Sequence, residues 1–268
     1  MFIIVTYKII ESINSFGVGY TDDDIKISSL FYMDDGVIFA ENLEDITNMT
    51  NRLYRVCLKY GLNLNKNKCK ILIINDKDNI KIEKIGEINV AQNIKYLGVI
   101  IDNKKKCFRS QINKILEKGL KFSSQIYSIL GNACNRMLIG KAFWKGLVLS
   151  NILYASETIT FNKEEIKKLQ RLDNIAYRYI LQVPIFTASE FLRSEVGSSC
   201  VQSRDIKNKI LFSKHALKDE SNSILNSIMS IEIEIKNTDW SEEVNNYMEL
   251  INLYITQIFA SENDQREC

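Results

Sequence analysis

Two adjacent carboxylates lie between two apolar segments near the start of the chain, in the sequence Leu30-Phe31-Tyr32-Met33-Asp34-Asp35-Gly36-Val37-Ile38-Phe39-Ala40. An Asp-Asp-Gly triplet between β-branched and aromatic runs predicts a hairpin, with Gly36 free to adopt a positive φ. We expect the turn to present Asp34 and Asp35 to solvent, outside any buried ion pair. Two carboxylates this close repel each other, and a hard cation such as Mg²⁺, which takes oxygen ligands, offsets that repulsion. An ordinary surface turn is the alternative interpretation.

The composition is that of a globular protein. The chain has 268 residues, of which 46% are hydrophobic and 25% charged, enough for one large or two modest domains. A single Pro and 11 Gly predict much regular structure. The formal net charge of +2 argues neither for nor against a nucleic-acid partner, so the local distribution of charge must decide.

The cysteines indicate neither a zinc site nor a disulfide framework. Six are present, without a C-x-x-C pair, and His215 is the single histidine. Reduced, intracellular cysteines are the default expectation. The apolar start of the chain lacks a basic segment and a cleavage-like end, so we predict no signal peptide. No uninterrupted run reaches the ~18 apolar residues of a membrane span, so we expect no membrane partner.

The first hundred residues mix helix and strand patterns. Apolar spacing predicts a helix over Phe2–Ile13, and Asn42, with Asp45 three residues later, predicts the start of a second helix that ends at Gly61. Thr21–Asp24 has the composition of a solvated turn. The predicted strands are the two hairpin arms and three later segments, namely Ile25–Tyr32, Val37–Ala40, Lys68–Ile74, Ile80–Ile88 and Asn93–Asp102. The last two are expected to pair, with Gly86 near the turn between them.

From about Lys104 onward, helical periodicity replaces strand patterns. We therefore predict an α+β first part followed by an all-helical region. The predicted helices are Ile112–Leu130, Met137–Ser156, a helix capped by Asn162 with Glu165, one from Thr187 to Gly197, Cys200–Leu217, Ser221–Ile233, and one capped by Asp239 with Glu242. The polar end, Ser261–Cys268, is expected to fray.

The order of these segments resembles the second half of the reverse transcriptase of non-LTR (LINE-type) retrotransposons, an RNA-directed DNA polymerase. The elements that carry the resemblance follow one another in the order Tyr32-Met33-Asp34-Asp35, Gly61-Leu62-Asn63-Leu64-Asn65 with Lys68, Tyr96-Leu97-Gly98, and Leu153-Tyr154-Ala155-Ser156-Glu157-Thr158. The resemblance spans roughly Phe2 to Gly197. Met33 departs from the pattern, because these elements usually have Ala there.

The resemblance implies roles for individual residues. Asp34 and Asp35 are similar to the palm carboxylates that hold two Mg²⁺ (or Mn²⁺) ions during nucleotidyl transfer. Tyr32 and Met33 would lie beside the primer terminus. Lys68 matches a lysine near the incoming dNTP, although a solvated lysine at a strand edge is the alternative. Tyr96, Leu97 and Gly98 resemble the primer grip, with a strand-end glycine as the alternative for Gly98.

The domain boundaries follow from the same resemblance: residues 1–103 as a partial palm, 104–181 as a thumb-like helical region and 182–268 as a helical connector. Lys104, Lys105, Lys106 and Arg109 would contact the backbone of an RNA template and DNA primer without reading sequence. A solvated charged face is the alternative.

The family's palm also needs a catalytic Asp on an earlier strand, and none precedes Asp34 in a matching segment. The sequence therefore predicts a partial palm that does not polymerise alone, with the rest of the palm and the fingers supplied in a longer polyprotein. A non-catalytic nucleic-acid-binding or interaction protein derived from such an element is the second interpretation. An unrelated helical scaffold with a fortuitous Asp-Asp turn is the third.

Overall fold

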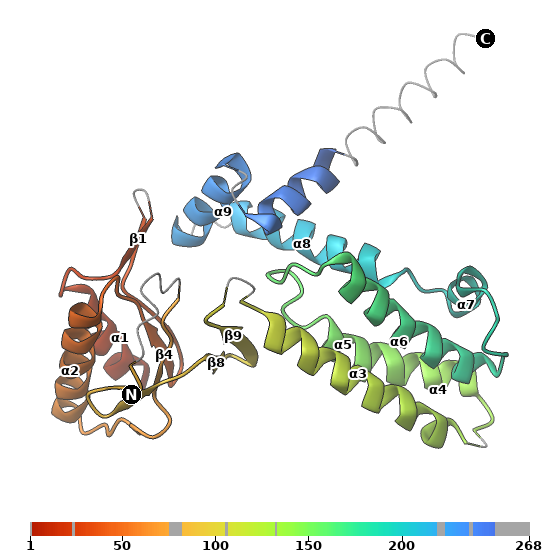
Figure 1. Ribbon diagram of the computed structural model, residues 1–268, viewed down its shortest axis with the longest axis horizontal. Coiled ribbons are helices and arrows are strands. Elements are labelled where there is room, and N and C mark those ends of the chain that lie inside the picture. Colours follow the sequence, from red (N-terminus) through yellow and green to blue (C-terminus); the bar gives the residue numbers. More distant parts are fainter. Residues whose placement is uncertain are drawn as a thin grey trace, which may run out of the picture. The chain divides into compact units, whose positions relative to one another are not determined.

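The computed structural model describes residues 2–22, 25–74, 82–104, 107–131, 133–218, 223–235 and 238–249. The chain divides into two compact units, Met1–Gln111 and Ile112–Cys268. The first unit combines helices with small β-sheets, and the described residues of the second are all helices and connecting turns (Figure 1). The predicted α+β class and the all-helical later region are confirmed. Within the described residues, no helix is long and apolar enough to cross a membrane.

Two amphipathic helices, α1 (Phe2–Asn14) and α2 (Leu43–Lys59), pack on each other in the first unit and confirm both helix predictions. Their core contains the buried side chains of Ile9, Ile13, Met49 and Cys57. The predicted start of α2 is also confirmed, because the Asn42 side chain accepts a hydrogen bond from the Asp45 N–H at 2.8 Å. Gly61 follows the helix with a φ of +72°.

The strands before α2 form two hairpins. Strands β1 (Tyr20–Asp22) and β2 (Ile25–Ile27) pair with each other, and β3 (Ser29–Tyr32) pairs with β4 (Asp35–Ile38). The prediction of one continuous arm over Ile25–Tyr32 was therefore wrong, because the chain changes partner at Ser28. The buried Ser28 hydroxyl donates to the Val18 carbonyl at 2.5 Å, a long-range contact without a local sequence signal.

The later strands are shorter than predicted. They are β5 (Lys70–Ile71), β6 (Lys84–Ile85), β7 (Ile88–Val90), β8 (Asn93–Tyr96) and β9 (Val99–Asp102). Strand β7 pairs in parallel with β5 and antiparallel with β6, and β8 pairs antiparallel with β9. The predicted strand Asn93–Asp102 is thus a hairpin that reverses at Leu97-Gly98, whereas Gly86, with a φ of +59°, lies in the β6–β7 turn. Residues 75–81, which include part of the predicted Ile80–Ile88 strand, lie outside the described residues.

The helices of the second part are α3 (Arg109–Leu130), α4 (Arg136–Phe143), the π-helix η1 (Trp144–Leu149), α5 (Ser150–Ile152), α6 (Lys163–Leu181), α7 (Ser189–Val196), α8 (Val201–Lys218), α9 (Ser223–Ile235) and a helix over 239–249. The predicted Met137–Ser156 helix differs in two ways, because its centre is a π-helix and it ends at Ile152. Such wide turns are rare and occur mostly inside α-helices.

The cap predictions in this part had mixed outcomes. Asn162 and Glu165 form a reciprocal capping box at the start of α6, as predicted. Thr187 was wrong as the start of α7, because its N–H is bonded to the Pro184 carbonyl and the helix begins at Ser189. Asp239 was also wrong as a cap, because the Thr238 hydroxyl accepts from the Ser241 N–H instead.

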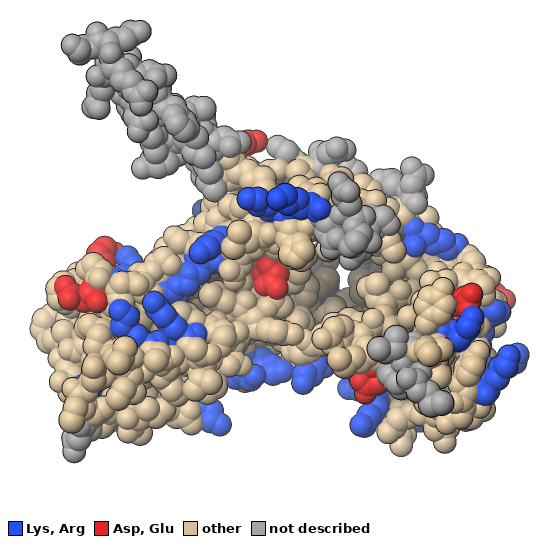
Figure 2. Space-filling view, turned by 180° about the vertical axis from the view of Figure 1, so that it is seen from behind, with Lys and Arg blue, Asp and Glu red and all other residues tan. Residues whose placement is uncertain are grey.

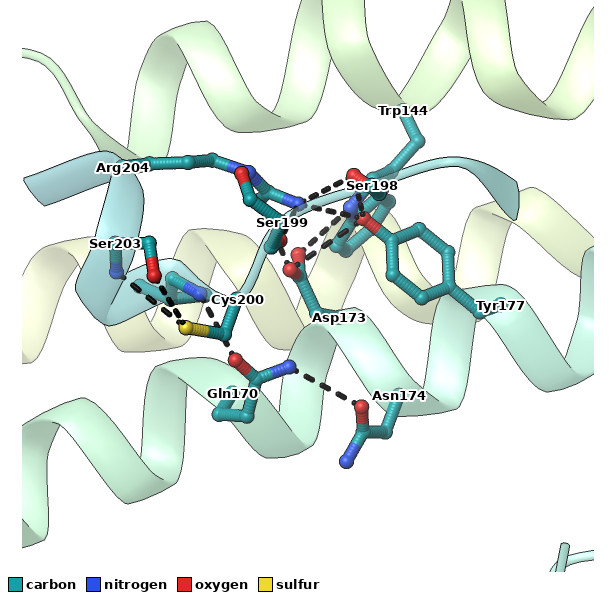
Figure 3. Close-up of polar contacts among 11 residues, drawn as sticks. Trp144, Gln170, Asp173, Asn174, Tyr177, Ser198, Ser199, Cys200, Ser203 and Arg204 are labelled. Carbon is teal, nitrogen blue, oxygen red and sulfur yellow. Dashed lines mark hydrogen bonds and ion pairs between the residues drawn. The ribbon is translucent and has the colours of Figure 1, made fainter. Parts of the chain in front are cut away.

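A buried polar network ties the helices of the second unit together (Figure 3). Asp173 on α6 is fully buried, and its carboxylate accepts from the indole of Trp144 at 2.8 Å and from the guanidinium of Arg204 at 2.9 Å. Arg204 also donates to the Tyr177 and Ser198 hydroxyls at 2.9 and 2.5 Å. Burial raises the pKa of Asp173, and the Arg204 charge opposes that rise. The network therefore joins η1, α6 and α8 around one buried ion pair, Asp173 with Arg204.

A second buried charge cluster lies on α8. Lys209 is fully buried and donates to Asp205 at 2.9 Å and to Glu243, on the 239–249 helix, at 2.7 Å. Burial, with smaller contributions from Glu243 and Glu157, raises the pKa of Asp205 to about 6 against the opposing effect of Lys209. The ion pair between Lys209 and Glu243 thus fixes the 239–249 helix on α8.

Candidate functional site

The carboxylate hairpin has a tight two-residue turn. Tyr32 pairs with Asp35 across β3 and β4, so Met33 and Asp34 are the turn residues. Met33 has a φ of +56°, a region that costs a residue with a side chain about 1–2 kcal/mol. The prediction that Gly36 supplies the positive φ was wrong, because Gly36 lies in β4.

Gly36 has a different role, which the structure makes plain. It pairs with Phe31 across the hairpin, and a Cβ added at Gly36 would lie 2.3 Å from the Phe31 ring. The missing side chain therefore makes room for an aromatic ring on the neighbouring strand. Phe31 in turn packs against the α1–α2 core, so the ring anchors the carboxylate hairpin on that core.

Asp34 in the turn and Asp35 at the start of β4 are both exposed, as predicted. Within the described residues, neither Asp34 nor Asp35 makes a hydrogen bond or an ion pair to another side chain. Tyr32 and Met33 beside them are 59% and 69% exposed. The hairpin tip thus presents two carboxylates and the exposed side chains of Tyr32 and Met33 to solvent.

The two carboxylates suit a hard divalent cation but do not complete a site for two. Mg²⁺ is commonly held by one or two carboxylates together with substrate phosphates and water. The described residues contain no group of three or more His, Cys, Asp or Glu side chains arranged to hold a metal. Asp34 and Asp35 therefore fit one partly protein-bound ion whose remaining ligands come from elsewhere.

The Tyr96-Leu97-Gly98 segment contains the tight turn between β8 and β9. Leu97 and Gly98 have φ values of +46° and +90°, so both turn residues adopt the left-handed conformation of a type I′ turn. Burial raises the pKa of Tyr96, and the negative charge of Asp35 raises it further. The fold thus brings Tyr96 within electrostatic range of the carboxylate hairpin, although the two are far apart in the sequence.

Lys68 lies at the end of a turn just before β5, where its N–H donates to the Asn65 carbonyl at 2.9 Å. Its side chain is exposed. The nearby Lys66, which sequence reasoning did not separate from it, is engaged, because it pairs with Glu87 and lies 4.5 Å from the centre of the Tyr54 ring. Of these two lysines, Lys68 is the one whose charge remains available to a ligand.

The basic segment before α3 is only partly described. Lys104 and Arg109 are exposed, whereas Lys105 and Lys106 lie outside the described residues. Asp102, whose role sequence reasoning missed, is buried, and its carboxylate accepts from the Ser110 N–H at 2.8 Å. A carboxylate at a helix N-terminus is favourable, so Asp102 at the end of β9 fixes the first turn of α3.

Comparison with known families gives one match. Residues 1–101 match the family model described as reverse transcriptase (RNA-dependent DNA polymerase). Searches of curated proteins and of solved structures found no match. The matched residues include the carboxylate hairpin, Lys68 and the Tyr96-Leu97-Gly98 turn. We conclude that the first unit of this chain is similar to the reverse transcriptase family, RNA-dependent DNA polymerases that use nucleotidyl transfer.

Proposed function

We propose that residues 1–101 are part of the palm of a non-LTR retrotransposon reverse transcriptase, which copies RNA into DNA by two-metal nucleotidyl transfer. The observation that carries this proposal is the Met33-Asp34 turn inside the matched residues. Asp34 in that turn and Asp35 at the start of β4 are exposed without a described partner, on a hairpin anchored by Phe31. Strained backbone at an exposed polar turn is typical of functional sites.

The proposal gives each residue of the site a task. Asp34 and Asp35 would bind Mg²⁺ or Mn²⁺, which activates a primer hydroxyl and stabilises the leaving pyrophosphate when bound. Lys68 would offset charge on the phosphates of the incoming dNTP. Tyr32, Met33 and the Tyr96-Leu97-Gly98 turn would position the primer end, which is the main contribution a protein makes to phosphoryl transfer.

We further propose that the helical region after residue 103 is thumb and connector. Lys104, Lys105, Lys106 and Arg109 would contact the phosphates of the template and primer where the chain passes from β9 into α3. The support is their place directly after the matched residues and the exposure of Lys104 and Arg109. Such contacts would be independent of sequence and sensitive to salt.

The ligand set predicts that these 268 residues alone do not extend a primer. Asp34 and Asp35 supply only part of the coordination of two ions about 4 Å apart. A site that lacked one of its ligands would lose transition-state stabilisation, and each ~1.4 kcal/mol lost is a tenfold loss in rate. The same shortage of ligands favours the second candidate, a non-catalytic nucleic-acid-binding protein derived from such an element.

Metal titration separates the two candidates. If the hairpin is a polymerase site, Mn²⁺ binding measured by calorimetry or electron paramagnetic resonance should weaken in Asp34→Asn and in Asp35→Asn. Glu195→Gln, at an exposed acid on α7, is the matched control and should bind as the parent chain does. Equal Mn²⁺ binding by all three variants would exclude the metal site and leave only the binding-protein candidate.

Primer extension tests the predicted inactivity. The purified chain is incubated with poly(rA), an oligo(dT) primer and dTTP in Mg²⁺ and then in Mn²⁺, and we expect no extension. Robust extension that disappears in Asp34→Asn would refute the inactivity while supporting the polymerase. In that case Asp22, Asp23 or Asp24 would be the residues to test for the missing carboxylate.

A further inference from the structure

Two charged side chains of α8 lie where charges are rarely found. Lysine, arginine, aspartate and glutamate side chains usually stay in water, and Figure 2 shows many of them on one face of the molecule. Lys209 and Asp205 instead have 0% and 1% of their side chains exposed, and they form an ion pair at 2.9 Å. A buried charge is costly unless it is paired and hydrogen-bonded, so the partners of each group decide whether the group stays charged.

The ammonium group of Lys209 has more than one carboxylate partner. Besides Asp205, it donates to the carboxylate of Glu243 on the 239–249 helix at 2.7 Å. The Glu243 side chain is 20% exposed, so its charge remains partly in contact with water. Lys209 would therefore keep an ionised partner even if Asp205 became neutral.

The Asp205 carboxylate is less well satisfied than the lysine. Its Oδ2 accepts from Lys209, whereas its Oδ1 is buried without a hydrogen-bond partner among the described residues. The charged groups that act on it are Lys209 on the same helix, Glu243 on the 239–249 helix and Glu157 on the loop before α6. One cation thus faces three carboxylates. We call these four residues the acid–lysine cluster.

The excess negative charge of the acid–lysine cluster includes its most buried carboxylate. Burial, with smaller contributions from the two glutamates, raises the pKa of Asp205 to about 6, against the opposing charge of Lys209. A proton on Asp205 removes this poorly solvated charge, and Lys209 stays paired with Glu243. Near pH 6 the cluster can therefore change its charge without losing the ion pair between α8 and the 239–249 helix.

The 239–249 helix contacts the acid–lysine cluster through two of its residues. Glu243 bonds to the buried lysine, and the Trp240 indole donates to the Glu157 carbonyl at 2.7 Å. Undocking the helix would remove Glu243 and admit water to Asp205, so two causes that raise the pKa of Asp205 would weaken. The protonation of Asp205 is therefore coupled to the position of the helix.

We infer that the acid–lysine cluster is a pH-sensitive latch, in which a proton on Asp205 tightens the docking of the 239–249 helix on α8. The docked state binds this proton more tightly than the undocked state, because the pKa of Asp205 is higher when the helix is docked. Docking is therefore favoured below about pH 6, and the gain is lost as the pH rises through that value. This inference goes beyond the proposed function, since the cluster lies outside the matched residues 1–101.

The test is amide hydrogen exchange of the full chain, followed by mass spectrometry at several pH values from 7.5 to 5. Protection factors are calculated against the intrinsic exchange rate at each pH. With a pKa of about 6 in the docked state and the ordinary value of 3.8 in the undocked state, docking should become about tenfold more favourable over this range. The protection factors of residues 241–249 should rise by the same factor.

Substitution of Asp205 tests whether its carboxylate causes this rise. Asp205→Asn keeps the shape of the side chain without its charge, so residues 241–249 should be about as protected at pH 7.5 as they are in the parent chain at pH 5, with little further change on acidification. Asp239→Asn, at an exposed acid on the same helix as Glu243, is the matched control and should keep the pH dependence of the parent chain. His215 is present in all of these chains, so any effect of its charge cancels.

Glu243→Gln tests the coupling between the helix and Asp205. It removes a carboxylate that raises the pKa of Asp205 and leaves Asp205 as the only carboxylate bonded to Lys209, so the rise in protection should move to lower pH. Equal protection of the parent chain at pH 7.5 and pH 5 would overturn the inference, even if a variant failed to fold. So would an Asp205→Asn chain that folds, as judged by circular dichroism, but is less protected than the parent chain at pH 7.5.

Discussion

Replacing Arg204 by Met should destabilise the second unit strongly, because it leaves Asp173 buried without its cation. The Asp173 side chain is fully buried and that of Arg204 is 13% exposed. The substitution removes the ion pair at 2.9 Å and the donors to the Tyr177 and Ser198 hydroxyls. Trp144 remains as a hydrogen-bond donor to Asp173 but carries no charge.

Breaking one partner of a buried ion pair costs about 3–5 kcal/mol of the free energy of unfolding. For a domain of 150–250 residues, each kcal/mol lowers Tm by about 2–4 °C, so the expected loss is roughly 6–20 °C. Lys207→Met is the matched control, since Lys207 is exposed on the same helix. We expect that control to change the free energy of unfolding by less than about 0.5 kcal/mol.

The loss should depend on pH in a defined direction. Burial already raises the pKa of Asp173, and removing Arg204 removes the charge that opposes this rise. A carboxyl whose pKa in the folded state lies above its unfolded value of about 3.9 does not lower the free energy of unfolding at low pH. It lowers that free energy increasingly as the pH rises through the folded pKa. The difference between Arg204→Met and the parent chain should therefore be largest at neutral pH and shrink on acidification.

The assay is urea denaturation followed by the fluorescence of Trp144 and Trp240, at neutral and at acidic pH. Comparing variant with parent at each pH cancels the titration of Asp205, which both chains share. If the free energy of unfolding of Arg204→Met were less than about 1 kcal/mol below that of the parent chain at neutral pH, the buried-charge argument would be refuted. So would a large deficit that is the same at both pH values, because it would point to lost packing instead of an uncompensated carboxylate.

Three shorter predictions concern the other elements. Gly36→Ala should destabilise the first unit by about 1–3 kcal/mol in urea denaturation, because the new methyl group meets the Phe31 ring; a neutral effect would show that the ring moves freely. Asn162→Ala should cost about 1 kcal/mol by removing the α6 cap, whereas Asn162→Asp should restore it. Charge reversal of Lys104 and Arg109 should weaken binding to an RNA–DNA duplex and flatten its salt dependence; an equal slope would mean that these side chains are only solvated.

Much of the local structure could be predicted from the sequence, because its signals are local. The α2 and α6 helices follow from apolar periodicity and from Asn42 and Asn162, whose side chains bond to backbone N–H groups three residues later. The exposure of Asp34 and Asp35 follows from the two polar residues between apolar strands. In each case the physical cause lies within one or two turns of chain, so the residues alone were enough.

Only the tertiary structure decided how these elements meet. Met33 instead of Gly36 adopts the positive φ, because the register that pairs Tyr32 with Asp35 places Gly36 in β4. Ile25–Ile27 leaves the predicted arm because Ser28 bonds to Val18. The pairing of Asp173 with Arg204 joins residues 31 positions apart. Such contacts depend on which distant side chains burial brings together, and neither periodicity nor local spacing encodes that choice.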